Sequence, residues 1–380
     1  MQYVPFGKTG INVSRLGFGC MRLPYDEKDG VKVFNEEKSV EMLHRAIDLG
    51  VNYFDTAPYY CDKQSEIIVG KALKGFRDKV YLSTKNPIEN DSGDDFQKRL
   101  ETSLGKLGTD YIDFYHFWGI SLETYETKID VKDGPLSRAL RLKEQGLIRH
   151  ISFSFHDKAE NMLEILRRGQ GIFSSVLCQY NLLDRSNEEG MALAHEMGLG
   201  VVVMGPVGGG RLGAPSEVIR GLLPGPVKSS AEVALRFVFN NPNVHIALSG
   251  MGDIAMVEEN ARLAGDIRPL TKEETESIEA TLAENKRLSE LYCTGCNYCM
   301  PCPAGINIPE IFKMMNYHRV YKITDYAKKQ YAMIGKVDWM KYENASACLD
   351  CGACEDKCPQ HLKIRDQLRQ THEALGAQEE

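Results

Sequence analysis

The sequence lacks three features that would each assign the protein to a particular class. Its first residues contain no charged stretch followed by an apolar core, so no secretory signal is expected. No apolar run approaches the ~18 to 20 residues that span a bilayer. Positive charge is not in excess either, since 46 Lys and Arg stand against 53 Asp and Glu. These absences predict a cytoplasmic protein that binds neither membranes nor nucleic acids.

The cysteines divide the chain into two chemically different parts. The chain has 380 residues, 43% hydrophobic and 26% charged, which is enough apolar material for a large core. This length fits one large α/β barrel with an addition, or two domains of common size. Of the 11 cysteines, Cys20, Cys61 and Cys178 are scattered, and the rest lie between positions 293 and 358. A reducing cytosol argues against a disulfide scaffold.

The first 270 residues alternate between strand-like and helix-like patterns. Segments such as the one from Ser39 have helical apolar spacing, and several end in glycine. The span from Ser14 to Ala264 matches the ~250 residues typical of a (β/α)₈ barrel. We therefore predict this α/β fold, a TIM barrel, for a domain covering residues 1–270. Its eight strand patterns begin near Arg15, Val51, Val80, Tyr111, Ile148, Ser175, Gly200 and Val244.

Three chemically active side chains lie at the ends of predicted strands. Asp55 and Tyr60 follow the second strand, and Lys85 ends the third. Active sites of this fold lie at the C-terminal ends of the strands, so the three would meet at one mouth of the barrel. An ammonium beside a phenol lowers the phenol pKa towards the range useful for proton transfer. The alternative is that Asp55 and Lys85 form only a structural ion pair.

The opening MQYVPFGKTGINVSRLGFG, the FDTAPYY motif and the LSTK strand resemble the aldo-keto reductase family, over about residues 1–270. This resemblance implies that Tyr60 is the general acid, that Lys85 lowers its pKa, and that Asp55 orients Lys85. It also implies that NAD(P)H delivers hydride to a carbonyl carbon while the tyrosine protonates the oxygen. Charge developing on that oxygen would meet a pre-positioned acid. We therefore expect an oxidoreductase that reduces a small aldehyde or ketone.

The fourth catalytic position departs from the family pattern. The family places a histidine five residues after the aspartate of the fourth strand, but counting from Asp113 gives Trp118, and the histidine is His116. Both side chains point to the same face of the strand, so His116 is expected one layer deeper in the barrel. Trp118 either donates its indole N–H to the substrate oxygen or forms an apolar wall. The departure also leaves reduction of a conjugated double bond as an alternative reaction.

Other positions match those with which the family binds its nicotinamide cofactor. Ser154 and Gln179 suit hydrogen bonds to the carboxamide, and Met204 occupies the place of a ring that stacks on nicotinamide. The glycine-rich run from Gly205 resembles the loop over the pyrophosphate, where glycines let backbone N–H groups approach phosphate oxygens. The remaining predicted cofactor-binding residues are Cys20, Met21, Asp55, Val207, Gly210, Glu259 and Asn260.

The segment after the eighth strand lacks two cations. Family members that prefer NADPH have a lysine near Gly250 and an arginine near Met256, which neutralise the 2′-phosphate of the cofactor. This chain has neither cation at these positions. A dianionic phosphate without such partners would be held poorly. We therefore predict NADH as the preferred cofactor, with NADPH as the alternative.

The second predicted domain, residues 271–380, carries two cysteine runs. The run from Cys348 has the CxxCxxCxxxCP spacing, in which three thiolates hold one 4Fe–4S cluster and the fourth usually binds the other. The run from Cys293 has one residue fewer before its last cysteine. Zinc is the competing interpretation, but two runs ending in Cys-Pro favour iron and sulfur. We assign Cys293, Cys296, Cys299 and Cys358 to one cluster, and Cys348, Cys351, Cys354 and Cys302 to the other.

The residues between the two runs have helical propensity, so the domain resembles a helical dicluster ferredoxin. The whole chain resembles the subgroup of aldo-keto reductases with such an extension, and air-sensitive clusters suggest an anaerobic setting. Three roles for the clusters remain open: structure or docking, electron transfer with a partner protein, and redox sensing. Coupling hydride transfer to one-electron clusters would ordinarily require a flavin, for which the sequence has no signature. The rival to an enzyme is an electron-transfer or redox-sensing protein whose barrel binds nucleotide with little turnover.

Overall fold

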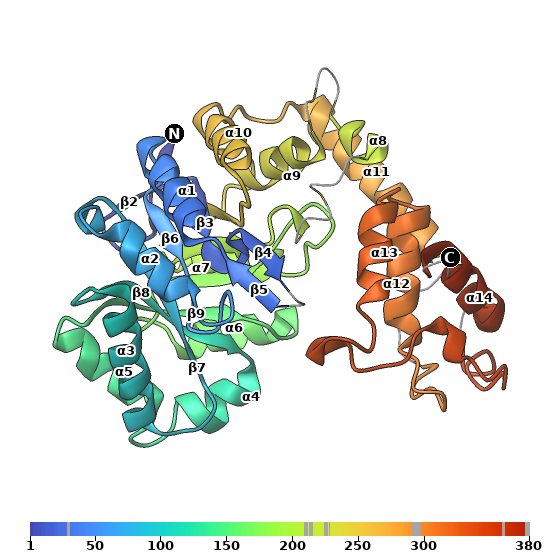
Figure 1. Cartoon of the computed structure of the whole chain (residues 1–380), viewed down its shortest axis with the longest axis horizontal. Coiled ribbons are helices and arrows are strands. Elements are labelled where there is room, and N and C mark those ends of the chain that lie inside the picture. Colours follow the sequence, from blue (N-terminus) through green and yellow to red (C-terminus); the bar gives the residue numbers. More distant parts are fainter. Residues whose placement is uncertain are drawn as a thin grey trace. The chain divides into compact units, whose positions relative to one another are not determined.

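The computed structural model describes residues 1–28, 31–208, 212, 216–223, 227, 229–290, 298–358 and 362–376. The chain divides into two compact units. The first contains Met1–Gly208 and Ala234–Pro269, and the second contains Gly209–Val233 and Leu270–Glu380. The segment Gly209–Val233, which follows a barrel strand in the sequence, thus groups with the second unit. Figure 1 colours the chain from its blue N-terminus to its red C-terminus.

The first unit is a closed barrel of eight parallel strands with helices around its outer face (Figure 1). Its strand order, β10-β11-β12-β3-β6-β7-β8-β9, is sequential around the barrel, with closure between β9 and β10. Each strand overlaps one of the eight predicted patterns, so the predicted (β/α)₈ fold is confirmed. The strands are β3 (Leu16–Gly19), β6 (Tyr53–Asp55), β7 (Tyr81–Pro87), β8 (Ile112–Ile120), β9 (Ile148–Phe155), β10 (Ser175–Gln179), β11 (Gly200–Met204) and β12 (Ile246–Ser249).

The helices between the strands begin and end at local sequence signals. The Asn35 side chain accepts a hydrogen bond from the Lys38 backbone N–H and caps the first helix. Gly108 ends another helix in the left-handed region, with φ 62°. The helices are α1 (Glu36–Asp48), α2 (Ser65–Leu73), α3 (Gly93–Leu107), α4 (Leu122–Thr124), α5 (Pro135–Glu144), α6 (Ala159–Arg168), α7 (Glu188–Glu196), α9 (Ser230–Phe239) and α10 (Ile254–Gly265).

The hairpin of β1 (Tyr3–Pro5) and β2 (Asn12–Ser14) precedes the barrel and closes its N-terminal end. Phe6 is fully buried there and packs edge-on against Phe114, with ring centres 5.1 Å apart. A Cβ atom on Gly200 would lie 2.3 Å from the Phe6 ring, so only glycine fits at the start of β11. This end of the barrel is therefore filled by apolar side chains. Polar side chains gather at the opposite end.

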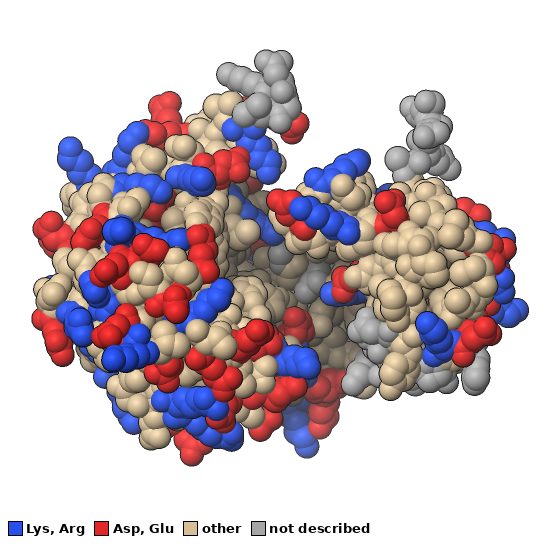
Figure 2. Space-filling model, turned by 90° about the horizontal axis from the view of Figure 1, so that it is seen from below, with Lys and Arg blue, Asp and Glu red and all other residues tan. Residues whose placement is uncertain are grey.

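A second hairpin, of β4 (Tyr25–Lys28) and β5 (Val31–Phe34), follows the first barrel strand. The strand and helix patterns of the sequence did not indicate it. Its Tyr25 and Val33 side chains are 46% and 45% exposed. On the barrel face that Figure 2 shows, acidic and basic side chains are interspersed, and no extended basic surface is seen among the described residues.

The second unit is a small helical body with its own core. The helices predicted between the two cysteine runs are present as α12 and α13, and they pack with α14 around buried Ile311, Phe312 and Leu368. Among the described residues, no helix is both long and apolar enough to span a membrane. The helices of this unit are α8 (Glu217–Arg220), α11 (Lys272–Glu290), α12 (Ile308–Arg319), α13 (Thr324–Ala332) and α14 (Ile364–Leu375).

Candidate functional site

A buried ion pair lies at the C-terminal ends of β6 and β7. Lys85 Nζ donates to Asp55 Oδ2 at 2.6 Å and to the Thr56 carbonyl at 2.8 Å. Ser83 Oγ donates to the other Asp55 carboxylate oxygen at 2.8 Å. The Lys85 and Asp55 side chains are only 1% and 2% exposed. Both charges are therefore held in a fixed geometry by neighbouring strands.

Tyr60 lies against this pair, as the sequence predicts. Lys85 Nζ is 4.8 Å from the centre of the Tyr60 ring. Burial raises the pKa of the Tyr60 phenol above its usual value, and the charge of Lys85 offsets only part of that rise. Lys85 thus acts on the pKa in the expected direction, but the net change is upward because desolvation is larger. The phenol is therefore protonated at neutral pH.

The lysine also keeps its proton. Burial by itself would lower the pKa of Lys85, but the neighbouring Asp55 and Tyr60 outweigh it, and the pKa is raised overall. The site thus holds an ammonium, a carboxylate and a neutral phenol side by side at neutral pH. This arrangement can deliver one proton from the phenol and stabilise the negative charge left behind.

His116 and Trp118 lie on the same strand at different depths. In the register of β7 and β8, His116 is opposite Lys85, and Trp118 is opposite Pro87. His116 is fully buried, and burial together with the charge of Lys85 lowers its pKa to about 3. Its imidazole is therefore neutral. Trp118 is partly exposed, and its indole and the Tyr60 ring form a T-shaped pair at a centroid distance of 5.7 Å.

The predicted cofactor residues on β9 and β10 are Ser154 and Gln179, and each lies beside polar backbone groups. Ser154 Oγ accepts the Gly119 backbone N–H at 2.7 Å, which leaves its own hydroxyl proton available to an acceptor. A Cβ atom on Gly205 would lie 2.7 Å from Gln179 Oε1, so the glycine lets that carboxamide approach the backbone. Asn181 Nδ2 donates to the Gly205 carbonyl at 3.0 Å. The sequence analysis missed Asn181, whose only signal is its position two residues after Gln179.

The other predicted cofactor residues differ in exposure. Cys20 is buried, and desolvation raises the pKa of its thiol well above the usual value, so it is no nucleophile. Asn260 Nδ2 donates to Ser249 Oγ at 3.2 Å and joins α10 to β12. The Arg22 side chain passes 3.4 Å from the position of a Cβ atom on Gly250. Met21 is exposed, Val207, Met204 and Glu259 are partly exposed, and Gly210 lies outside the described residues.

The cysteine runs lie in the second unit. Burial raises the pKa of the Cys354 thiol, and Cys302, Cys348 and Cys354 pack against the same core of this unit. Thiolates are the ligands that iron–sulfur clusters use, and the donor set therefore fits them. Within the described ranges, no three His, Cys, Asp or Glu side chains form a group that could hold a metal ion. Cys351 is exposed, Cys299 is buried and Cys358 partly exposed, and Cys293 and Cys296 lie outside the described residues.

Two family models match the sequence. The first is described as the aldo/keto reductase family and matches residues 15–217. The chain belongs to the aldo/keto reductase family. The second is described as a 4Fe-4S dicluster domain and matches residues 292–362. The predicted oxidoreductase and the predicted iron–sulfur domain are thereby confirmed.

Relatives of this family resemble the chain over about three quarters of its length. The uncharacterized oxidoreductase YqkF of Bacillus subtilis is 28% identical over 307 residues, which cover 72% of this chain and 94% of the relative. The holo form of the aldo-keto reductase AKR11C1 from Bacillus halodurans is 29% identical, with a TM-score of 0.61 and coverage of 74% and 96%. An aldo/keto reductase from Klebsiella pneumoniae, solved with NADP and acetate, is 25% identical, with a TM-score of 0.59 and coverage of 73% and 94%.

Proposed function

We propose that the protein is an NAD(P)H-dependent reductase of a small carbonyl compound. The observation that carries this proposal is the group of Asp55, Tyr60 and Lys85 at the C-terminal end of the barrel strands, where Lys85 Nζ lies 2.6 Å from Asp55 Oδ2 and 4.8 Å from the centre of the Tyr60 ring. Membership of the family supports an oxidoreductase. The Klebsiella relative was solved with NADP, which supports a nicotinamide cofactor here.

The residues of the chain account for the proton part of the reaction. The bound nicotinamide would supply the hydride to the carbonyl carbon. Tyr60 is protonated at neutral pH and donates its proton to the carbonyl oxygen as negative charge develops there. The Lys85 ammonium, held by Asp55, then stabilises the tyrosinate. Uptake of a proton from solvent restores the phenol for the next turnover.

We propose different roles for Trp118 and His116. The contacts of Trp118 with the Tyr59 and Tyr60 rings favour an apolar wall over a hydrogen-bond donor. His116 is buried and neutral, and it is opposite Lys85 in the strand register. We therefore propose that its imidazole packs beneath Lys85 and helps to fix the position of the ammonium, without touching the substrate. The reduction of a conjugated double bond remains the alternative reaction for a site with an indole at this position.

Replacement of Tyr60 by Phe tests the mechanism. The Tyr60→Phe variant should lose carbonyl reduction but bind NADH as the wild type does, because only the proton donor is removed. The exposed Tyr25 of β4 offers a matched control, and Tyr25→Phe should retain full activity. Steady-state NADH oxidation against a panel of aldehydes and ketones, with a binding titration, measures both properties. Near-normal turnover by Tyr60→Phe would contradict the proposed role.

The cofactor preference proposed here is NADH. Ser154 and Gln179 would hold the carboxamide, while Gly250 and Met256 supply no cation for a 2′-phosphate. Direct titrations with NADH and NADPH should give a lower Kd for NADH, and tighter binding of NADPH would contradict the proposal. Gly250→Lys should increase NADPH affinity selectively, whereas Gly252→Lys, which has open space around it, is the matched control.

We propose two 4Fe–4S clusters in the second unit, with Cys302 joining Cys348, Cys351 and Cys354. Cys302, Cys348 and Cys354 pack against the same core of the second unit, which supports this grouping across the two runs. Anaerobically reconstituted protein should contain about eight irons and eight sulfides per chain. Cys351→Ala should remove up to half of the iron, while Cys61→Ala, a change in the barrel, should leave it unchanged. Zinc, or fewer than about four irons per chain, would contradict two clusters.

Electron transfer is a second candidate function, and the 4Fe–4S dicluster match favours it. Hydride transfer moves two electrons and a cluster moves one, so a link between the two would ordinarily require a flavin. The Cys351→Ala variant separates the candidates. Unchanged carbonyl reduction with NADH would assign the clusters to structure or to a partner protein. Loss of activity with an intact barrel would assign them to the electron path.

A further inference from the structure

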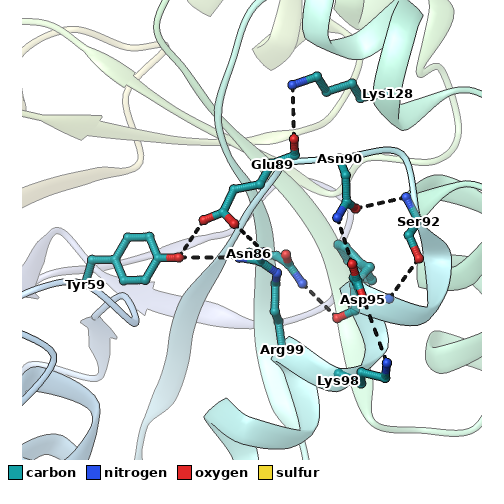
Figure 3. Close-up of polar contacts among 10 residues, drawn as sticks. Tyr59, Asn86, Glu89, Asn90, Ser92, Asp95, Lys98, Arg99 and Lys128 are labelled. Atoms are coloured by element: carbon teal, nitrogen blue, oxygen red, sulfur yellow. Dashed lines mark hydrogen bonds and ion pairs between the residues drawn. The ribbon is translucent and has the colours of Figure 1, made fainter.

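Three residues outside the proposed catalytic group form a network at the C-terminal end of the barrel. The Tyr59 hydroxyl donates to Glu89 Oε1 at 2.7 Å. Arg99 Nη2 donates to Glu89 Oε2 at 2.6 Å, and Arg99 Nη1 donates to the Tyr59 hydroxyl at 3.4 Å. Figure 3 shows the phenol and the guanidinium converging on the carboxylate. We call Tyr59, Glu89 and Arg99 the rim clamp.

The rim clamp joins segments that follow two consecutive barrel strands, β6 and β7, and Lys128 adds a contact from the segment after β8. Tyr59 follows β6, Glu89 follows β7, and Arg99 is on α3. Lys128, which follows β8, donates from Nζ to the Glu89 carbonyl at 3.3 Å (Figure 3). The clamp therefore restrains loops that would otherwise move independently of one another.

The clamp reaches the catalytic group through aromatic contacts. The Tyr59 ring lies 5.5 Å from the Trp118 indole, at an interplanar angle of 41°. On the other side, Trp118 meets Tyr60 edge-on, at 5.7 Å and 89°. Both centroid distances lie in the range of favourable aromatic pairs. The contacts thus run from Glu89 to the Tyr59 ring, and from there through the Trp118 indole to Tyr60, the proposed proton donor.

The backbone beside Trp118 is irregular and is held separately. The register between β8 and β9 shifts between Phe117 and Ile120, and Gly119 has φ 61°. Ser154 Oγ accepts the Gly119 N–H and fixes this irregular turn. A register shift of this kind redirects the neighbouring side chain. Ser154 thus holds the backbone beside Trp118, and the Tyr59 and Tyr60 rings contact the indole itself.

The clamp fixes the position of the Tyr59 side chain more than it stabilises the folded barrel. The Arg99 and Glu89 side chains are 28% and 54% exposed, and exposed ion pairs add little to the free energy of unfolding. The hydrogen bonds from Arg99 and Tyr59 lower the pKa of Glu89 to about 2, and the bond to Glu89 raises the pKa of Tyr59. The clamp is therefore intact throughout the physiological pH range.

We propose that Glu89 and Arg99 are positioning residues that hold Tyr59 and, through it, the Trp118 indole against Tyr60. The wall that results is rigid, so a carbonyl compound with a bulky planar substituent meets a preformed surface beside the proton donor. A small aliphatic aldehyde has no planar substituent to place against this wall, so we expect it to gain nothing from the clamp. The kinetic part of this proposal rests on the proposed carbonyl reductase function, and the positional part does not.

Tryptophan fluorescence tests the positional part. The chain has two tryptophans, and Trp339 in the second unit is 74% exposed, so Trp339→Phe leaves Trp118 as the sole emitter. In this background, Tyr59→Phe and Arg99→Ala should shift the emission to longer wavelength and increase acrylamide quenching, compared at equal iron content. Lys98→Ala is the matched control. Lys98 precedes Arg99 on the same helix, is 75% exposed and pairs with Asp95 at 3.8 Å (Figure 3).

Kinetics test the effect on substrate. For benzaldehyde, Tyr59→Phe and Arg99→Ala should raise KM by about three- to tenfold, the size of a modest net hydrogen-bond contribution, with kcat retained. For propanal, KM should not change, and Arg99→Lys should restore part of the benzaldehyde effect. Unchanged fluorescence in both clamp variants, or the same changes in Lys98→Ala, would overturn the proposal. If the wild type reduces no carbonyl at all, the proposed function fails, and the fluorescence result still decides whether the clamp positions Trp118.

Discussion

Replacement of Asp55 by Asn would leave the Lys85 ammonium buried without its counter-charge. Lys85 is 1% exposed, and after the loss of the carboxylate its Nζ keeps the neutral Thr56 carbonyl as a hydrogen-bond acceptor. Removing one member of a buried ion pair typically costs about 3–5 kcal/mol. A domain is stable by only about 5–15 kcal/mol in total, so this is a large fraction. We expect Asp55→Asn to fold, with a much less stable barrel.

The loss of stability should depend on pH. In the wild type the folded-state pKa of Lys85 is above its unfolded value, so the contribution is present at neutral pH and is lost only as the pH rises through the folded-state pKa. In Asp55→Asn, burial acts without the carboxylate, and the folded-state pKa falls below the unfolded value. Between the two pKa values, Lys85 is then protonated in the unfolded chain and neutral in the folded protein. Between these two pKa values, the stability of the variant should rise by up to about 1.4 kcal/mol per pH unit.

Hydrogen exchange of the intact protein at pH 7 and 9 checks this expectation. Mass spectrometry of peptides that cover Tyr81–Pro87 reports the opening free energy of the barrel, after correction for intrinsic rates. Asp113→Asn is the matched control, since Asp113 pairs with Arg77 at 2.7 Å and a guanidinium does not titrate in this range. The opening free energy that Asp113→Asn loses relative to the wild type should be equal at both pH values. An Asp55→Asn deficit that is also independent of pH would refute the reasoning.

Three further substitutions should each affect only the unit in which they lie. Gly205→Ala should weaken NADH binding, because its Cβ atom would lie 2.7 Å from Gln179 Oε1 at a backbone φ of 63°, and Gly252→Ala should have no effect in the same titration. Leu368→Ala, at a position 1% exposed, should destabilise the second unit by about 2–5 kcal/mol and leave exchange in the barrel unchanged. Tyr331→Phe leaves the Ala345 N–H without its acceptor and should cost the second unit about 1–3 kcal/mol by the same exchange measurement.

Elements with a strong local signal could be predicted from the sequence. The helical pattern from Ser39 falls largely in α1, which ends at Asp48. The hairpin of β4 and β5 was missed, although the sequence carries an Asp-Gly pair between residues that favour strands. The hairpin adds an irregular step to an otherwise regular alternation, and periodicity alone does not distinguish it from a loop.

The site shows a similar division between local and non-local information. Asp55, Tyr60 and Lys85 could be placed together because each is tied to the end of a particular strand, and parallel strands end at the same edge of the barrel. The net rise in the pKa of Tyr60 could not be predicted, since it depends on how much water its neighbours exclude. Glu89 and Arg99 had no signal, because a charged residue in a loop or on a helix looks the same in a sequence whether it is solvated or bonded.

The sequence by itself determined which groups are available for chemistry and roughly where along the chain they occur. Strand and helix periodicity, the residues at strand ends and the cysteine spacing are local properties, and they were sufficient for the barrel and the iron–sulfur domain. Only the tertiary structure decided the balance between burial and charge at Tyr60 and Lys85, and the contact from Glu89 through Tyr59 to Trp118. Those properties depend on which distant residues share a small volume, because desolvation and hydrogen-bond geometry act over a few ångströms in space rather than along the sequence.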